Sequence, residues 1–314
     1  WGEIIMLRHR SAKQLVVLSG KGGTGKTSLT AALMHLAFQS NQESVFVDAD
    51  VDAANLALVS DAKPLEARPF TGSQLATIDP TICDQSGICF EVCRYNAIVK
   101  PEQPNKPYRV IDLLCDGCAA CVYNCPESAI QMVQQQDGEW YHSKSAYGHL
   151  FHAELFPGAE NTGKLVTTVK QHAKLFAEDH QLSLIIVDGP PGIGCPVISA
   201  SAGADLALLV AEPGISGRHD LQRIIKTLEH FKIPILICIN KADISIEGTK
   251  AIYDLVRGLG HTVIGEIPFD DAVPLAMVNA QPITTFSQDG PASGAIKSIW
   301  LKVARQLFSE SKKE

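Results

Sequence analysis

The chain has 314 residues, a formal net charge of −7, 46% hydrophobic residues and 19% charged residues. These values are typical of a globular protein, and the acidic balance argues against nucleic acid as the main partner. No apolar run is as long as a membrane-spanning helix, so we do not expect a membrane partner. Seven of the nine cysteines lie between residues 83 and 125, which favours metal ligation in a reducing, cytoplasmic compartment over disulfides.

The first predicted element is a buried parallel strand at residues 15–18, and a glycine-rich loop follows it at once. The loop reads Gly20-Lys21-Gly22-Gly23-Thr24-Gly25-Lys26-Thr27-Ser28, and a helical pattern continues after it. Strand, glycine loop and helix start are the context of a P-loop, whose backbone N–H groups cradle phosphate oxygens. We therefore expect residues 20–28 to bind nucleotide phosphates, with Lys26 on the β- and γ-phosphates and Thr27 on Mg²⁺.

Two further predicted strands end in acidic residues. Residues 45–47 lead into Asp48-Ala49-Asp50, and the apolar run 184–187 ends in Asp188. An aspartate at the end of such a buried strand is typical of a Walker B motif, so Asp188 is expected to reach Mg²⁺ through water.

Between these strands the cysteine pattern occurs twice, at a constant offset of 32 residues. The second copy reads Cys115-x2-Cys118-x2-Cys121-x3-Cys125-Pro126, which is the ligand run of a bacterial two-cluster ferredoxin. In that arrangement the fourth cysteine ligates the other cluster. The crossing rule predicts one set made of Cys93, Cys115, Cys118 and Cys121, and a second set made of Cys83, Cys89 and Cys125, with Ser86 in the fourth position.

Serine is a poor substitute for a thiolate on iron. The sequence therefore predicts one [4Fe-4S] cluster and one [3Fe-4S] or labile [4Fe-4S] cluster, with water or the Ser86 alkoxide on the last iron. A pair of zinc sites is the alternative, because four-cysteine sets also suit zinc. The spacing within each run, the trailing Cys-Pro and the twofold repeat favour iron–sulfur.

The remaining predicted elements are two strands and a final helix. Residues 235–239 lead into Asn240-Lys241-Ala242-Asp243, and residues 263–268 precede Asp270. The Asn-Lys-Ala-Asp run also fits a guanine-reading motif, in which an aspartate accepts hydrogen bonds from the base, so GTP stays an alternative to ATP. The amphipathic stretch 296–308 is expected to dock on the domain rather than on a membrane.

The loop with its additional Lys21, the Asp48-Ala49-Asp50 segment and the Asp188-Gly-Pro-Pro-Gly run together resemble the MinD/ParA/Mrp family, which includes the nitrogenase iron protein. The resemblance covers residues 15–59 and about 180–285. It implies an α/β P-loop ATPase fold, a mostly parallel sheet flanked by helices, interrupted by a ferredoxin-like α+β insertion. The expected parts are 1–61 and 146–314 for the ATPase domain and 62–145 for the insertion.

The resemblance also implies roles for individual residues. Lys21 would reach the partner's nucleotide in an ATP-sandwiched homodimer, and Asp50 would orient water and contact the Mg²⁺ shell. Lys21, Lys26, Asp50 and Asp188 form the expected catalytic set. Asn240, Pro268 and Asp270 match the residues that surround the adenine in such relatives. Cys195 lies where the nitrogenase iron protein has a cluster cysteine, but no second such cysteine accompanies it, which favours a packed residue or reactive thiol.

These observations lead to a main hypothesis and two alternatives. The main one is a Mg²⁺-ATP-dependent iron–sulfur protein that couples ATP turnover to electron transfer toward an unidentified redox partner. The first alternative is a metallocluster carrier, in which the Ser86 site loads or donates iron to a recipient protein. The second is a MinD-like positioning ATPase whose clusters sense redox state.

Overall fold

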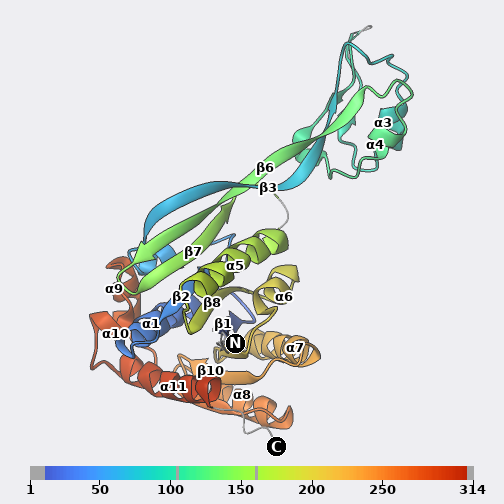
Figure 1. The fold of residues 1–314 in the computed structure, drawn as a ribbon. Coiled ribbons are helices and arrows are strands. Elements are labelled where there is room, and N and C mark those ends of the chain that lie inside the picture. Colours follow the sequence, from blue (N-terminus) through green and yellow to red (C-terminus); the bar gives the residue numbers. More distant parts are fainter. Residues whose placement is uncertain (1–10, 104–105, 160–161, 310–314) are drawn as a thin grey trace, which may run out of the picture. The chain divides into compact units, whose positions relative to one another are not determined.

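The computed structural model describes residues 11–103, 106–159 and 162–309, and the chain divides into two compact units (Figure 1). The larger unit comprises Trp1–Arg68, Trp140–Glu154 and Thr162–Glu314. The smaller one, called the cysteine unit below, comprises Pro69–Glu139 and Leu155–Asn161. Both main boundaries fall inside long strands, β3 (Lys63–Ile78) and β6 (Ile130–Ser145), rather than at residues 62 and 145 as the sequence suggested.

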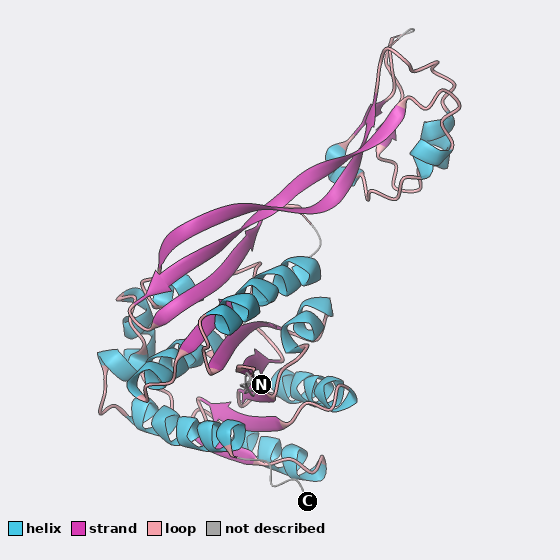
Figure 2. Cartoon of the chain, viewed as in Figure 1, coloured by secondary structure: helices cyan, strands magenta, loops and turns pink. Residues whose placement is uncertain are grey.

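The larger unit is built on a sheet whose strand order is β11-β10-β9-β1-β8-β2-β7-β6-β3. Every pair from β11 to β7 is parallel, which confirms the predicted mostly parallel α/β architecture (Figure 2). The central strands are apolar and buried on both faces, as expected when helices cover a parallel sheet. The parallel strands are β1 (Lys13–Ser19), β2 (Ser44–Asp48), β7 (Gly148–Leu155), β8 (Leu184–Pro191), β9 (Leu206–Ala211), β10 (Ile235–Asn240) and β11 (Val263–Ile267).

Helices pack on both faces of this sheet (Figure 1). On one side α1 (Lys26–Gln39) packs with α2 (Leu56–Val59), α10 (Ile283–Phe286) and α11 (Pro291–Phe308), and α9 (Ala272–Val278) joins them. The other side carries α5 (Thr162–Asp179), α6 (Cys195–Ser201), α7 (Ile215–His230) and α8 (Ile246–Gly258). Helix α11 buries Ile296, Ile299, Trp300, Val303 and Leu307 in the main core, so its apolar face docks on the domain as predicted.

No helix within the described part of the chain is both long enough and apolar enough to cross a membrane.

The cysteine unit keeps the 32-residue repeat in its backbone. Left-handed residues occur in matched pairs, namely Gln85 with Gly117, Gly87 with Ala119, and Asn96 with Ser128. The short helices α3 (Ile88–Val92) and α4 (Ala120–Tyr123) each follow one such residue and pack on each other. The paired strands β4 (Ile98–Val99) and β5 (Arg109–Val110) and the 3-10 helix η1 (Asp112–Leu114) lie between them in sequence. The sequence repeat is therefore also a structural repeat.

Candidate functional site

The glycine loop connects β1 to α1, as the P-loop context requires. Gly23 and Gly25 have φ values of 77° and 87°, a region that side chains rarely adopt. A Cβ on Gly25 would also collide with the side-chain amide of Asn240. The Thr24 hydroxyl is buried and has no hydrogen-bond partner among the residues described. A buried donor without a partner is costly, so this loop is shaped for an acceptor such as a phosphate oxygen.

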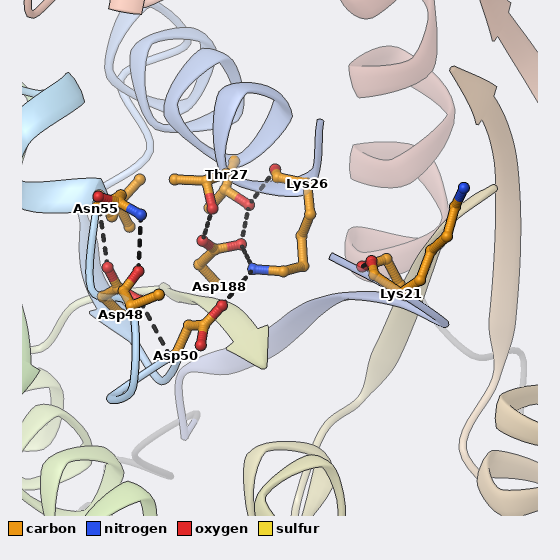
Figure 3. Close-up of polar contacts among 11 residues, drawn as sticks. Lys21, Lys26, Thr27, Asp48, Asp50, Asn55 and Asp188 are labelled. Carbon is orange, nitrogen blue, oxygen red and sulfur yellow. Dashed lines mark hydrogen bonds and ion pairs between the residues drawn. The ribbon is translucent and has the colours of Figure 1, made fainter. Parts of the chain in front are cut away.

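Asp188 accepts three hydrogen bonds from the start of α1 (Figure 3). Its Oδ1 lies 2.9 Å from Lys26 Nζ and 2.8 Å from Thr30 Oγ1, and its Oδ2 lies 2.7 Å from Thr27 Oγ1. Asp188 is fully buried and Lys26 nearly so. Burial alone would lower the pKa of Lys26, but Asp188, Asp48 and Asp50 together raise it, so the ammonium stays charged.

Two more carboxylates face this ion pair from the end of β2. Asp48 is fully buried and accepts hydrogen bonds from the backbone N–H groups of Asp50, at 3.1 Å, and Leu56, at 2.8 Å. Burial, and then the charge of Asp188, raises the pKa of Asp48 to about 7. Burial raises the pKa of Asp50 to about 6, and its Oδ2 lies 3.9 Å from Lys26 Nζ.

This arrangement fits a magnesium nucleotide. Thr27 supplies a hydroxyl and Asp188 and Asp50 supply carboxylates, which are the oxygen ligands that Mg²⁺ accepts together with phosphates. Lys26 contacts Asp188 and Asp50, so phosphates would compete with these carboxylates for its ammonium.

Lys21 lies apart from this cluster and its side chain points away from it (Figure 3). Its Nζ forms an ion pair of 3.0 Å with Glu212 Oε2, just beyond the end of β9. The other carboxylate oxygen of Glu212 lies 2.9 Å from Lys241 Nζ. Lys241 also donates to the carbonyl of Gly23, at 3.3 Å.

The residues expected around the base have mixed surroundings. Asn240 donates to the carbonyl of Thr24, at 2.7 Å, and so braces the P-loop. Asp270 accepts from the backbone N–H groups of Ala272 and Ala292, at 2.9 and 3.3 Å, near the starts of α9 and α11. Pro268 lines a surface cavity beside α8, together with Asp243. The Oδ1 of Asp243, the candidate guanine acceptor, already accepts from the N–H of Phe269 at 2.7 Å.

In the cysteine unit the predicted ligand residues line two separate cavities. One is lined by Cys93, Cys115, Cys118 and Cys121, and the other by Cys83, Ser86, Cys89 and Cys125. These are the two sets that the crossing rule predicts. The backbone N–H groups of Ala97 and Ala129 point at the Sγ atoms of Cys93 and Cys125, at 3.4 and 3.3 Å.

Two buried thiols, one in each cavity, favour the protonated state. Burial raises the pKa of Cys89 and of Cys121, and neighbouring cysteines raise both further. Such thiols need a cationic centre before they ionise, which is how metal ligation couples to deprotonation. Within the described ranges, no three His, Cys, Asp or Glu side chains converge as they would on one metal ion. A single zinc ion would draw its sulfurs to within about 4 Å of one another, given a Zn–S distance of about 2.3 Å.

Of the two cysteines outside the repeat, Cys238 is fully buried in β10, in agreement with its apolar context. Cys195 begins α6 and is exposed, so the packed-residue interpretation is wrong and a reactive thiol remains.

Three residues of the site were not singled out from the sequence. Thr30 and Asp48 lie in the charged cluster, and Glu212 holds Lys21. Asp48 stands in the same acidic segment as Asp50, but nothing in the sequence shows that it is buried. The Glu212–Lys21 contact joins residues 191 positions apart, and only the adjacency of β9 and β1 creates it.

Residues 15–283 match the CobQ/CobB/MinD/ParA nucleotide binding domain. The chain is 32% identical over 290 residues to the uncharacterised protein MJ0578 of Methanocaldococcus jannaschii, covering 92% of this chain and 96% of that protein. It is 25% identical to the septum site-determining protein MinD of Synechocystis, covering 86% and 80% of the two chains.

The structure of MinD from Pyrococcus horikoshii complexed with Mg-ADP superposes with a TM-score of 0.59 at 18% identity, covering 96% of this chain and all of that one. This likeness shows the fold. The match over residues 15–283 and the 32% identity to MJ0578 show that the chain belongs to the CobQ/CobB/MinD/ParA nucleotide-binding family and is a P-loop ATPase.

Proposed function

We propose that this ATPase is a MinD-type switch, closing into a homodimer on ATP, whose cysteine unit binds two iron–sulfur clusters and so adds a redox input. The observation that carries the proposal is the division of seven cysteines and Ser86 between two cavities in the predicted sets. A structural repeat with matched backbone conformations around both cavities supports it.

The contacts of Asp188 suggest how the chain itself contributes to ATP turnover. Phosphates would compete with Asp188 for Lys26, and Asp188 and Thr27 would then be free to hold the Mg²⁺ shell. When bound, Mg²⁺ neutralises charge on the phosphate oxygens. Asp50, whose Oδ2 lies 3.9 Å from Lys26 Nζ at the phosphate end of the site, would orient the attacking water.

The named relatives bear on the choice among the three hypotheses. Those reported above with assigned roles are septum site-determining MinD proteins, which favours a positioning ATPase with redox sensing over electron delivery. A structure of a MinC:MinD complex from Aquifex aeolicus, with a TM-score of 0.55, also covers 93% of this chain. By analogy, we propose that the closed dimer here recruits a protein partner.

ATP-gated electron transfer is the second candidate. The helices that carry Cys89 and Cys121 pack on each other, and Cys121, from the other cavity, contributes to the raised pKa of Cys89. Two clusters held so close would form a path for electrons as well as a sensor. The acceptor would then be a redox protein that docks on the closed dimer.

Iron and acid-labile sulfide measured on anaerobically purified protein test the cluster part of the proposal. We expect about seven to eight iron atoms per chain, the sum for one [4Fe-4S] and one [3Fe-4S] or second [4Fe-4S] cluster. Cys118→Ser should remove about half of that iron, whereas Cys195→Ser, a change of an exposed cysteine outside the repeat, should remove none. Zinc in place of iron, or equal iron in both variants, would contradict the proposal.

A further inference from the structure

Glu212 lies between two lysines at the edge of the sheet where nucleotide is expected. It follows β9, which pairs with β1 on one side and with β10 on the other. Lys21 follows β1 and Lys241 follows β10. Because the carboxyl ends of parallel strands meet at one edge, the sheet brings a single carboxylate between both cations.

The carboxylate of Glu212 forms short ion pairs with both lysines. Each carboxylate oxygen of Glu212 takes one ammonium, at 3.0 Å for Lys21 and 2.9 Å for Lys241. Burial alone would raise the pKa of Glu212, but hydrogen bonds from Lys241 and Lys21 lower it. A Cβ at Gly217, in the first turn of α7, would lie 2.8 Å from the backbone carbonyl oxygen of Glu212, so this glycine lets α7 begin close to Glu212.

We propose that Glu212 is a positioning residue that holds Lys21 against its own subunit in the single chain and must release it when the ATP-bound dimer closes. The inference rests on the proposed homodimer, in which Lys21 reaches the partner's nucleotide. Glu212 then competes with the partner's phosphates for one ammonium. After release it still holds Lys241, so its carboxylate keeps a cation in both states.

The ion pair between Glu212 and Lys21, called the clamp below, sets how readily the dimer forms. A partly exposed ion pair of this kind contributes little, and a closing dimer breaks two of them. Glu212→Gln removes the charge and keeps the size, so the dissociation constant of the dimer should fall about threefold to tenfold. Glu212→Asp keeps the charge but is one methylene shorter, and should lie between Glu212→Gln and the unaltered protein.

The test is sedimentation velocity with saturating Mg²⁺ and a non-hydrolysable ATP analogue, over a range of protein concentrations. Asp205→Asn is the matched control, because Asp205 pairs with Lys13 at the opposite end of the same strand, at 2.7 Å. It should leave the dissociation constant unchanged. In parallel, the protein concentration that gives half-maximal ATP turnover should fall for Glu212→Gln.

A purely structural Glu212 would give the opposite sign, because loss of a supporting contact weakens the dimer. An equal or weaker dimer in Glu212→Gln, with the unaltered protein dimerising normally, would overturn the clamp alone. If Glu212→Gln does not fold, Glu212→Ser tests the same change with a smaller side chain. Failure of the unaltered protein to dimerise with ATP would overturn the proposed dimer and the clamp together.

Discussion

At the scale of single residues, Asp188 organises the charged cluster at the start of α1. It is fully buried, and two hydroxyls and one ammonium donate to it. A buried carboxylate of this kind is stable only when its charge is balanced, so Lys26 is a structural counter-ion before it meets a nucleotide. The same lysine is therefore expected to affect both activity and stability.

Lys26→Ala removes the cation that contacts phosphate, so we expect ATP turnover to fall by roughly 100-fold or more, as when one preorganised donor to a developing charge is lost. Lys13→Ala, which removes an exposed ion pair, should retain turnover. Steady-state phosphate release from both variants measures this. Undiminished turnover in Lys26→Ala would show that hydrolysis does not use this P-loop.

Asp48 gives a prediction about pH. Its folded-state pKa of about 7 lies above its ordinary value of 3.8, so the folded chain holds a proton that the unfolded chain has lost between these values. Its contribution to stability is present below about pH 4 and is lost as pH rises toward and through 7. From pH 5.5 to 7.5 this loss is on the order of 2 kcal/mol.

Urea unfolding of the nucleotide-free protein at the two pH values measures this loss. Asp48→Asn should show a smaller drop in the free energy of unfolding than the unaltered protein. Asp61→Asn, an exposed aspartate paired with Lys63, should behave like the unaltered protein. The difference between variants matters, because buried histidines such as His152, whose pKa burial lowers to about 4, add stability that is lost at acid pH. Equal drops in all three proteins would contradict the assignment of Asp48.

The role of a site residue could be predicted from the sequence where a motif fixes its neighbours. It could not be predicted where only the fold brings the neighbours together. Lys26, Thr27 and Asp188 come together as expected, because the P-loop and a Walker B strand define their positions locally. The contact of Asp270 with the base stays a prediction, and its carboxylate also accepts from backbone N–H groups near the starts of α9 and α11. Neither these hydrogen bonds nor the burial of Asp48 is encoded in a local pattern.

At the scale of elements, apolar runs were sufficient to predict β1, β2, β8, β10, β11 and the docked helix α11, whereas β9 was not predicted. The strands β3 and β6 were not anticipated, because neither contains a long apolar run: β3 mixes polar and apolar residues and is mostly exposed, and β6 is largely polar. The sequence therefore placed the insertion between 62 and 145, whereas the compact unit begins at Pro69 and ends its first segment at Glu139. A boundary inside a continuous strand leaves no turn or linker signal to read.

The repeated cysteine loops give the second element-scale prediction. Ser86→Cys supplies the missing thiolate, so the second cavity should gain a fourth sulfur ligand and hold a complete cubane. Iron should rise by about one atom per chain, and any [3Fe-4S] signal in the oxidised EPR spectrum should disappear. Ser298→Cys, on an exposed position of α11, should change neither.

Two outcomes of this experiment would change the interpretation. An unaltered spectrum in Ser86→Cys would show that this position does not face the cluster. If the chain were a cluster carrier, Ser86→Cys should also block ATP-dependent iron transfer to an apo-protein, because the labile iron would then be held firmly. Transfer at the original rate would count against the carrier hypothesis.

At the scale of the whole molecule, a nucleotide-binding sheet and a cysteine-rich unit occur in one chain, and β3 and β6 run through both units. If ATP favours a closed dimer and closure alters the surroundings of the clusters, linkage requires that cluster oxidation state alters ATP-driven closure in return. This reciprocity separates a redox-responsive switch from an ATPase with unconnected clusters.

An EPR-monitored redox titration of anaerobically purified protein, with and without a non-hydrolysable ATP analogue, tests this coupling most directly. We predict that the nucleotide shifts the midpoint potential of at least one cluster by about 60 mV or more, a tenfold change for a one-electron couple. Lys26→Ala should abolish the shift while keeping the clusters. Clusters with identical potentials in both conditions, or a protein without iron–sulfur signals, would contradict the proposed coupling.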